Sequence, residues 1–492
     1  MHPMPGDSSA PRDLHKTTIA AESDSPSRRR GEPDVNVLVI AWYPHEPDRV
    51  GELAVIPATG VTQVIGRGDE DDGRLRFFRA RPGRLEPTEP LASPALSRRQ
   101  LEVRVDTDGM HVRRVGQCPM RVNGVATDEA VVQPADTLRF RQELLLLCTR
   151  RAARIPPLRH LEPDKVGPFG KPDALGILGE SPAAWALRDQ ISFAAQSSAH
   201  VLVLGETGTG KELAARAVHK LSSRAGRPLV ARNAATIPPG LVDAELFGNV
   251  RNYPNPGMAE RRGLIGQADG GFLFLDEIGE LPAELQAHLL RVLDSGGEYQ
   301  RLGESSSQRS DLRLIAATNR DPTELKHDLL ARLTVSVEVP PLAERLEDIP
   351  LLVEHLVLRA AEMSPKVAAR FIERGAGGTP RVRAATRLID ELMRRKYEEN
   401  TRGLEAILWA AMAGSEGDTV EWSERPTDRP AARSEPPASR SPRNTEPPEG
   451  EIRAALAQAE GNVARAAKAL GLTSRYALYR LMQKLGIDRG GG

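Results

Sequence analysis

A glycine-rich turn near the middle of the chain follows a short apolar stretch and precedes a helical pattern. Its residues are Gly205, Glu206, Thr207, Gly208, Thr209, Gly210, Lys211 and Glu212. The order strand, glycine loop and helix is typical of a P-loop, since glycines let backbone N–H groups face phosphate oxygens at a helix N-terminus. We therefore predict that these residues bind ATP, with the Lys211 charge at the β- and γ-phosphates. A chance glycine turn is the alternative, and the flanking pattern disfavours it.

Two other apolar stretches end in polar residues suited to phosphate chemistry. Residues 272–275 run into Asp276 and Glu277, and residues 312–317 run into Thr318 and Asn319. We predict that Asp276 binds Mg²⁺, directly or through water, and that Glu277 polarises the attacking water. Asn319 is placed to sense the γ-phosphate or the water. Glu212 stands where Ser or Thr usually holds Mg²⁺. Taken alone, each stretch also fits a plain strand-to-turn exit.

Composition limits the class of protein. The 492 residues carry 67 basic and 67 acidic side chains, so net charge does not indicate nucleic-acid binding. The two cysteines, Cys118 and Cys148, lack metal-type spacing and form no disulfide framework. The polar N-terminus has no apolar signal segment, and no apolar run is long enough for a membrane span. We expect a cytoplasmic protein without a membrane partner.

Hydrophobic periodicity and proline-rich stretches predict a multidomain chain. The expected segments are 1–34 disordered, 35–151 an all-β sandwich, 152–174 a linker, 175–350 an α/β P-loop domain, 351–414 its α-helical lid, 415–448 a proline-rich linker, and 449–488 an all-α module.

The central motifs together resemble the AAA+ domain of bacterial enhancer-binding proteins, the activators of sigma-54 RNA polymerase. They are GESPA (179–183), GETGTGKE (205–212), AELFG (244–248), QADGGFLFLDEIGELP (267–282), LRLIAATN (312–319) and LAERLEDIPLL (342–352). The resemblance implies a homo-oligomeric ring, usually a hexamer, with ATP bound between subunits. It also implies that Asn233 holds Glu277, that Arg332 is an arginine finger reaching the neighbouring ATP, and that Arg402 is the sensor arginine of the lid.

Three positions depart from this family. Lys326 replaces a second arginine finger, and lysine lacks the bidentate fork of arginine. Residues 397–399 replace the Trp-Pro-Gly that usually precedes the lid motif. The GAFTGA loop, which touches sigma-54 in the family, is replaced by Asn-Tyr-Pro-Asn-Pro-Gly at 252–257. ATP chemistry does not depend on that loop, whereas sigma-54 remodelling does.

The N-terminal β segment resembles a forkhead-associated (FHA) domain, an eleven-stranded sandwich that reads phosphothreonine. Its candidate phosphopeptide residues are Arg67, Ser97, Arg98 and Asn123. Arginine can pair with phosphate bidentately and a serine hydroxyl can donate to it. Gln100 replaces the usual structural histidine, and Gln117 and Cys118 replace the usual Thr-Asn pair. Gly-Arg and Asn-Gly are also common turn sequences, so plain turns are the alternative.

The C-terminal segment resembles the Fis-type helix-turn-helix domain that ends enhancer-binding proteins. Helices are expected at 452–459, 463–470 and 475–485. The last helix would enter the major groove of double-stranded DNA, with contacts from Ser474, Arg475, Tyr476 and Arg480. A helical protein–protein module with a basic face is the alternative.

The sequence thus supports an ATP-hydrolysing, DNA-binding regulator of the sigma-54 activator type, controlled through a phosphothreonine protein partner. The second hypothesis is a DNA-binding AAA+ regulator that does not remodel sigma-54 polymerase, because NYPNPG replaces the GAFTGA loop. A third, a phosphopeptide scaffold with a decayed ATPase, is disfavoured by the intact Lys211, Asp276 and Glu277.

Overall fold

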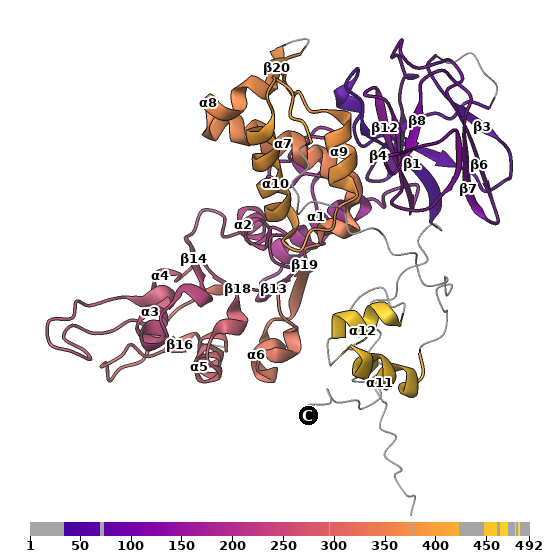
Figure 1. Cartoon of the computed structure of the whole chain (residues 1–492). Coiled ribbons are helices and arrows are strands. Elements are labelled where there is room, and N and C mark those ends of the chain that lie inside the picture. The colour runs from indigo at the N-terminus through magenta and orange to yellow at the C-terminus, as the bar shows by residue number, and fades with distance from the viewer. Residues whose placement is uncertain are drawn as a thin grey trace, which may run out of the picture. The chain divides into compact units, whose positions relative to one another are not determined.

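The computed structural model describes residues 34–68, 73–294, 296–375, 378–422, 447–459, 463–470, 478 and 481–482. The chain forms two compact units, 1–423 and 424–492, which are treated separately below. The first unit contains a β-sandwich, an α/β layer and a lid of mainly helices (Figure 1).

The N-terminal part is an all-β sandwich, as the sequence predicts. Among its described residues, one sheet has the order β5-β4-β2-β1-β12-β11-β8-β9 and the other β10-β7-β6-β3. The strands are β1 (Val35–Trp42), β2 (Leu53–Ile56), β3 (Gln63–Ile65), β4 (Phe78–Arg81), β5 (Arg84–Pro87), β6 (Leu101–Asp106), β7 (Gly109–Arg114), β8 (Met120–Val122), β9 (Val125–Ala126), β10 (Glu129–Val132), β11 (Thr137–Phe140) and β12 (Leu144–Arg151). These are twelve strands, one more than the eleven expected.

The α/β layer has a parallel five-stranded sheet in the order β14-β15-β18-β13-β19. Its strands are β13 (Val201–Leu204), β14 (Leu229–Asn233), β15 (Phe272–Asp276), β18 (Arg313–Thr318) and β19 (Val335–Glu338), and β16 (Glu298–Tyr299) pairs with β17 (Gln308–Arg309) outside it. The helices are α1 (Pro182–Gln196), α2 (Lys211–Leu221), α3 (Val242–Phe247), α4 (Gly263–Gln267), α5 (Ala283–Leu293) and α6 (His327–Arg332).

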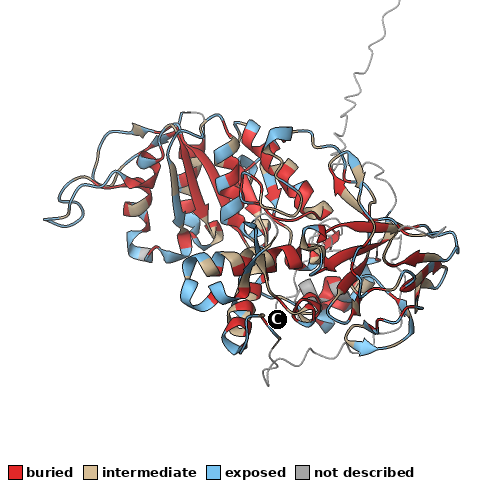
Figure 2. Cartoon of the chain, turned by 90° about the horizontal axis from the view of Figure 1, so that it is seen from above, coloured by how far each residue is buried: buried red, intermediate tan, exposed pale blue. Residues whose placement is uncertain are grey.

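Helices cover both faces of this sheet, which explains its continuous apolar strands. Phe272 and Phe274 of β15 share a core with α1 and α2, while Leu273 and Leu275 share the opposite core with α3–α6. Figure 2 shows the strands buried and the connecting loops exposed.

The lid (residues 349–414) contains two short strands in addition to the helices that the sequence predicts. Its helices are α7 (Ile349–Met363), α8 (Pro365–Ala368), α9 (Thr386–Met393) and α10 (Asn400–Gly414). Between α8 and α9 the chain forms a hairpin of β20 (Ile372–Arg374) and β21 (Pro380–Val382), so the purely helical prediction for 351–414 was wrong here. The β-branched Ile372 and Val382 are paired across the ladder, and Gly378 with φ of +79° helps the chain turn.

The sandwich and the lid share one hydrophobic core. In β1, Leu38 and Ile40 face the sandwich interior, while Val37 and Val39 pack in a core with Leu388 and other residues of the lid. Strand β1 is therefore buried on both faces, and Figure 1 shows α9 beside the sandwich. The expected linker 152–174 is packed as well, since Ile155 and Leu161 are buried within it.

The second unit contains α11 (Glu449–Gln458) and α12 (Val463–Ala469). Both helices pack around a small core that includes Leu478, Leu481 and Met482. The candidate DNA-contact residues Ser474, Arg475, Tyr476 and Arg480 lie outside the described residues. Within the described part of the chain, every helix is too short or too polar to span a bilayer.

Candidate active site

The glycine loop (residues 205–210) joins β13 to α2. Gly208 and Gly210 have φ of +75° and +103°, the left-handed region that glycine adopts without a Cβ penalty. A Cβ atom at Gly208 would lie 2.0 Å from the Glu399 carbonyl oxygen of the lid. Glycine at this position is therefore required both by the backbone turn and by the close approach of the lid.

Lys211 opens α2 and is buried inside the loop. Its Nζ atom donates hydrogen bonds to the carbonyl oxygens of Gly205 at 3.1 Å and Glu206 at 3.2 Å, and lies 3.8 Å from Glu277 Oε1. Glu212 instead pairs with Arg216 at 2.7 Å on an exposed part of α2. The positive charge at the loop thus comes from Lys211, while Glu212 is not arranged as a metal ligand.

The polar ends of three adjacent strands meet beside the loop. Asn233 at the end of β14 is in register with Asp276 at the end of β15. The Glu277 N–H donates to Asp276 Oδ1 at 3.0 Å, and Glu277 has φ of +51°. Asn319 follows β18 and donates from Nδ2 to Thr207 Oγ1 at 3.0 Å. Carboxyl ends of parallel strands form one edge, which is where α/β folds bind ligands.

A cleft of about 530 Å³ is lined by Asn233, Asp276 and Glu277 together with part of the glycine loop. Its lining includes Thr207, Gly208, Thr209, Gly210, Lys211, Glu212, Asn233, Asp276, Glu277 and Arg402. Leu178, Leu352 and His355 add an apolar and aromatic wall. Burial lowers the pKa of His355, and the positive charge of Arg359 lowers it further.

Two candidate residues need separate mention. The Asn233 side-chain oxygen accepts a hydrogen bond from the Ala235 N–H at 2.9 Å, so its contact with Glu277 stays a prediction. Arg332, at the end of α6, pairs with Asp294 at 2.7 Å and is half exposed. It does not line the cleft of its own chain. That position is compatible with an arginine that acts on a neighbouring subunit.

The donors in the cleft fit a nucleoside triphosphate with Mg²⁺. Gly210 leaves open space where a side chain would stand, and Lys211 supplies the positive charge. Among the described residues no group of three or more His, Cys, Asp or Glu could hold a metal. Mg²⁺ usually binds through one or two carboxylates together with phosphate oxygens and water, and Asp276 supplies such a carboxylate.

Sequence reasoning missed the residues that join the lid to this cleft. Asp348 is fully buried and accepts hydrogen bonds from the Glu180 N–H at 2.8 Å and from Ser181 Oγ at 2.6 Å. Arg345 pairs with Asp348 at 2.9 Å. These contacts join the GESPA and LAERLEDIPLL motifs, which lie far apart in the sequence. A local pattern could not reveal that they are partners. Asn400, for which the sequence predicted no role, also joins the lid to the glycine loop, since its Nδ2 donates to the Thr207 carbonyl oxygen at 3.0 Å.

The four candidate phosphopeptide residues fall into two groups. The Arg67 N–H donates to the Ser97 carbonyl oxygen at 3.2 Å, and the Arg74 guanidinium donates to the carbonyl oxygens of Arg67 at 3.2 Å and Arg98 at 3.0 Å. Arg67, Ser97 and Arg98 are thus brought together.

Asn123, the fourth, braces the turn after β8. Its Nδ2 donates to Asp136 at 2.8 Å and its Oδ1 accepts from the Thr137 N–H at 3.0 Å. Gln100 is buried, and it accepts from the Ser97 and Cys118 N–H groups at 3.3 Å. Gln100 therefore has a structural role between two loops, where the FHA pattern has a histidine.

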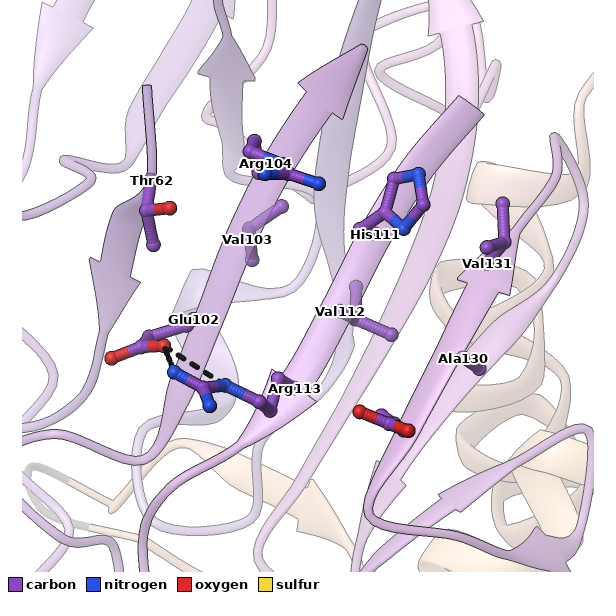
Figure 3. Close-up of a pocket in the computed structure, with 10 residues that line it drawn as sticks. Thr62, Glu102, Val103, Arg104, His111, Val112, Arg113, Ala130 and Val131 are labelled. Carbon is purple, nitrogen blue, oxygen red and sulfur yellow. Dashed lines mark hydrogen bonds and ion pairs between the residues drawn. The ribbon is translucent and has the colours of Figure 1, made fainter. Parts of the chain in front are cut away.

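A second hollow, of about 570 Å³, lies on the outer face of the small sheet (Figure 3). Glu102 on β6 pairs with Arg113 on β7 at 2.6 Å, and Asp106 pairs with His111 at 2.9 Å. Hydrogen bonds from Arg113 and Arg99 lower the pKa of Glu102. The facing charges neutralise one another, so this hollow has none of the features of the cleft at the glycine loop.

The fold and the cleft define a P-loop AAA+ ATPase domain. Residues 177–338 match the family described as the sigma-54 interaction domain. The formate hydrogenlyase transcriptional activator of Salmonella typhimurium is 39% identical over 323 residues, which cover 64% of this chain and 44% of that protein. The transcriptional regulatory protein ZraR of the same species is 37% identical over 314 residues, covering 62% of this chain and 68% of ZraR. The NtrX structure from Brucella abortus with ADP is 31% identical, covers 64% of this chain and 70% of NtrX, and has a TM-score of 0.45.

The chain therefore belongs to the family of transcriptional regulators that carry a sigma-54 interaction domain. It spans less than half the length of the formate hydrogenlyase activators that it matches.

Proposed function

We propose that this protein hydrolyses ATP to drive transcription regulation of the sigma-54 activator type. The observation that supports this most strongly is a cleft lined by the glycine loop, the Asp276–Glu277 pair and Arg402, with Asn319 hydrogen-bonded to Thr207 of that loop. Relatives named as transcriptional activators support the regulatory role.

Each residue has a task in the proposed reaction. The glycine loop and Lys211 hold the phosphates, and Asp276 holds Mg²⁺, which supplies positive charge to the phosphate oxygens when it is bound. Glu277 accepts a hydrogen bond from the attacking water and aligns it. Asn233 is proposed to hold the Glu277 carboxylate in place. Asn319, bonded to Thr207 of the loop, and Arg402 of the lid are proposed to sense the γ-phosphate.

Arg332 is proposed to act on the nucleotide of a neighbouring subunit, within a homo-oligomeric ring of six. Arg332 is half exposed, and Asp294 holds its guanidinium at the surface. An exposed pair of this kind exchanges its partner at little cost.

Residues 449–488 are proposed to bind double-stranded DNA upstream of the promoter. The residues proposed to contact DNA are Ser474, Arg475, Tyr476 and Arg480. The protein is proposed to act in the cytoplasm.

The sandwich is proposed to be an FHA domain that reads a phosphothreonine protein partner. The Arg67 N–H bonds to the Ser97 carbonyl oxygen, and the Arg74 guanidinium bonds to the carbonyl oxygens of Arg67 and Arg98, which supports a common site for the three candidates. Asn123 is proposed as the fourth residue of the phosphopeptide site, and its side chain also bonds to Asp136 and Thr137.

The loop that replaces GAFTGA favours a second candidate function, a DNA-binding AAA+ regulator that does not remodel sigma-54 polymerase. Asn249 is fully buried and donates to the carbonyl oxygens of Val250, Tyr253 and Ala259. Tyr253 packs on Gly303, near β16. The loop between α3 and α4 is thus held by its own hydrogen bonds, and its residues 252–257 differ in sequence from GAFTGA.

One transcription assay separates the two functions. Purified protein, ATP and sigma-54 polymerase are combined on a sigma-54 promoter template, at a protein concentration high enough that an upstream site is not needed. Transcripts made by the wild type but not by Glu277→Gln support activation. Normal ATP hydrolysis without any transcript from sigma-54 polymerase would instead support the second function.

A further inference from the structure

Asn400, the first residue of α10, joins three segments that are distant in the sequence. It is 1% exposed and has φ of +49°, a conformation that asparagine tolerates better than most residues. Its Oδ1 accepts a hydrogen bond from the Leu342 N–H at 2.7 Å. Its Nδ2 donates to the Thr207 carbonyl oxygen at 3.0 Å and to Glu206 Oε2 at 3.1 Å. The amide orientation is fixed, because a backbone N–H can only donate and a carbonyl oxygen can only accept.

The backbone on both sides of Asn400 also touches the glycine loop. The Thr401 N–H donates to the Gly208 carbonyl oxygen at 3.1 Å. A Cβ atom on Gly208 would lie 2.0 Å from the Glu399 carbonyl oxygen and 3.2 Å from Arg402 Cβ. The start of α10 is therefore seated directly on the loop that holds the phosphates.

We propose that Asn400 is a positioning residue that fixes Arg402 of the lid relative to the glycine loop. The inference rests on the proposed ATPase function. Thr401 and Arg402 line the cleft, whereas Asn400 is buried and does not. Asn400 thus acts through Arg402 and through Thr207, which also accepts a hydrogen bond from Asn319. A displacement of the loop by nucleotide is passed to the lid through these bonds.

The chemistry of the three bonds selects asparagine. Aspartate keeps the acceptor for Leu342 but has no donor for Thr207, and it places a second carboxylate beside Glu206. Glycine adopts the positive φ freely but loses all three bonds. Asn400→Asp and Asn400→Gly therefore separate the side-chain contacts from the backbone conformation.

The test uses the full chain and measures kcat and KM for ATP and the dissociation constants of ATP and ADP. The variants are Asn400→Asp, Asn400→Gly, Arg402→Ala and the Asn400→Asp/Arg402→Ala double variant. Asn36→Asp in β1 makes the same chemical change in the sandwich and serves as the control. Since leaving a buried partner unsatisfied costs free energy equivalent to about tenfold or more in rate, kcat of Asn400→Asp should fall by ~10-fold. The preference for ATP over ADP should fall with it.

The double variant identifies the route of the effect. If Asn400 acts through Arg402, the double variant should be within about twofold of Arg402→Ala alone, because coupled residues are not additive. If the reductions in kcat of the two single variants multiply in the double variant, the proposal is overturned. Wild-type kcat in both Asn400 variants would also overturn it. Equal weakening of ATP and ADP with unchanged kcat would also overturn it, since that pattern indicates a merely structural role.

Hydrogen exchange of the nucleotide-free protein gives a readout that needs no hydrolysis. Asn400→Asp should raise exchange in residues 205–210 and 342–346 together, while β1 stays protected. Unchanged exchange in either segment would contradict the proposal. If the wild type fails to hydrolyse ATP, the proposed function is lost, but the exchange result still decides the role of Asn400.

Discussion

Arg139 on β11 and Asp390 on α9 form an ion pair with 2.9 Å between Nε and Oδ2, and Asp390 is fully buried. Thr137 donates to the other oxygen of Asp390 at 2.6 Å, and Arg394 pairs with it at 3.3 Å. Two more arginines of the sandwich repeat this arrangement, Arg81 with Glu180 at 3.2 Å and Arg151 with Glu347 at 2.6 Å. These three pairs, a fourth between Asp48 and Arg381 at 3.5 Å, and a shared core therefore join the sandwich to the ATPase part.

Asp390→Ala should destabilise the first unit, because it leaves Arg139 and Arg394 without their buried carboxylate. Removing one partner of a buried pair typically costs about 3–5 kcal/mol. Denaturant unfolding of the full chain measures this. Glu298→Ala breaks the exposed pair with Arg309 and should cost about 1 kcal/mol or less. Equal effects of the two variants would show that the sandwich is not held by this pair.

Gly208→Ala should separate the lid from the glycine loop. The added Cβ atom would meet the Glu399 carbonyl oxygen, in addition to the cost of a positive φ. Gly60→Ala is the matched control, since Gly60 has φ of +71° and open space around its Cβ position. The affinity for ATP and the midpoint temperature of thermal unfolding should both fall for Gly208→Ala. Gly60→Ala should lose only the backbone cost, about 1 kcal/mol of the free energy of unfolding. Equal loss in both would remove the argument for close lid contact.

His355 should make stability depend on pH. Burial lowers the pKa of His355 in the folded protein, with Arg359 adding to the shift and Glu354 and Glu362 opposing it. The unfolded chain then binds the proton more readily, so stability is lost as pH falls through the unfolded value of about 6.5. His355→Gln should flatten this part of the profile between about pH 7.5 and 5.5. An unchanged slope in that variant would assign the pH dependence to other groups.

Removal of residues 449–492 should abolish DNA binding and leave ATP hydrolysis in place, because residues 1–423 form a compact unit of their own. Fluorescence anisotropy with double-stranded DNA and a parallel ATPase assay measure the two activities. Retained sequence-specific binding would contradict the helix-turn-helix assignment.

Local patterns predicted the glycine loop and the Asp276–Glu277 pair, because strand, loop and helix are adjacent in the chain. The same approach could not show what covers a buried strand. The apolar run of β1 indicates burial, yet Val37 and Val39 pack on helices more than 300 residues later. In the sequence, Asn400 is typical of the first residue of a helix. Its hydrogen bond to Thr207 is evident only in the folded structure. The β20–β21 hairpin was missed because its strands are only three residues each.

Hydrolysis of ATP by the full chain tests the central claim most directly, with nucleotide binding measured in parallel. The wild type should turn over ATP, Lys211→Ala should lose nucleotide binding, and Glu277→Gln should bind ATP but lose at least about 99% of turnover, as expected for loss of the group that aligns water. Normal hydrolysis by Glu277→Gln, or normal binding by Lys211→Ala, would contradict the assignment of this cleft.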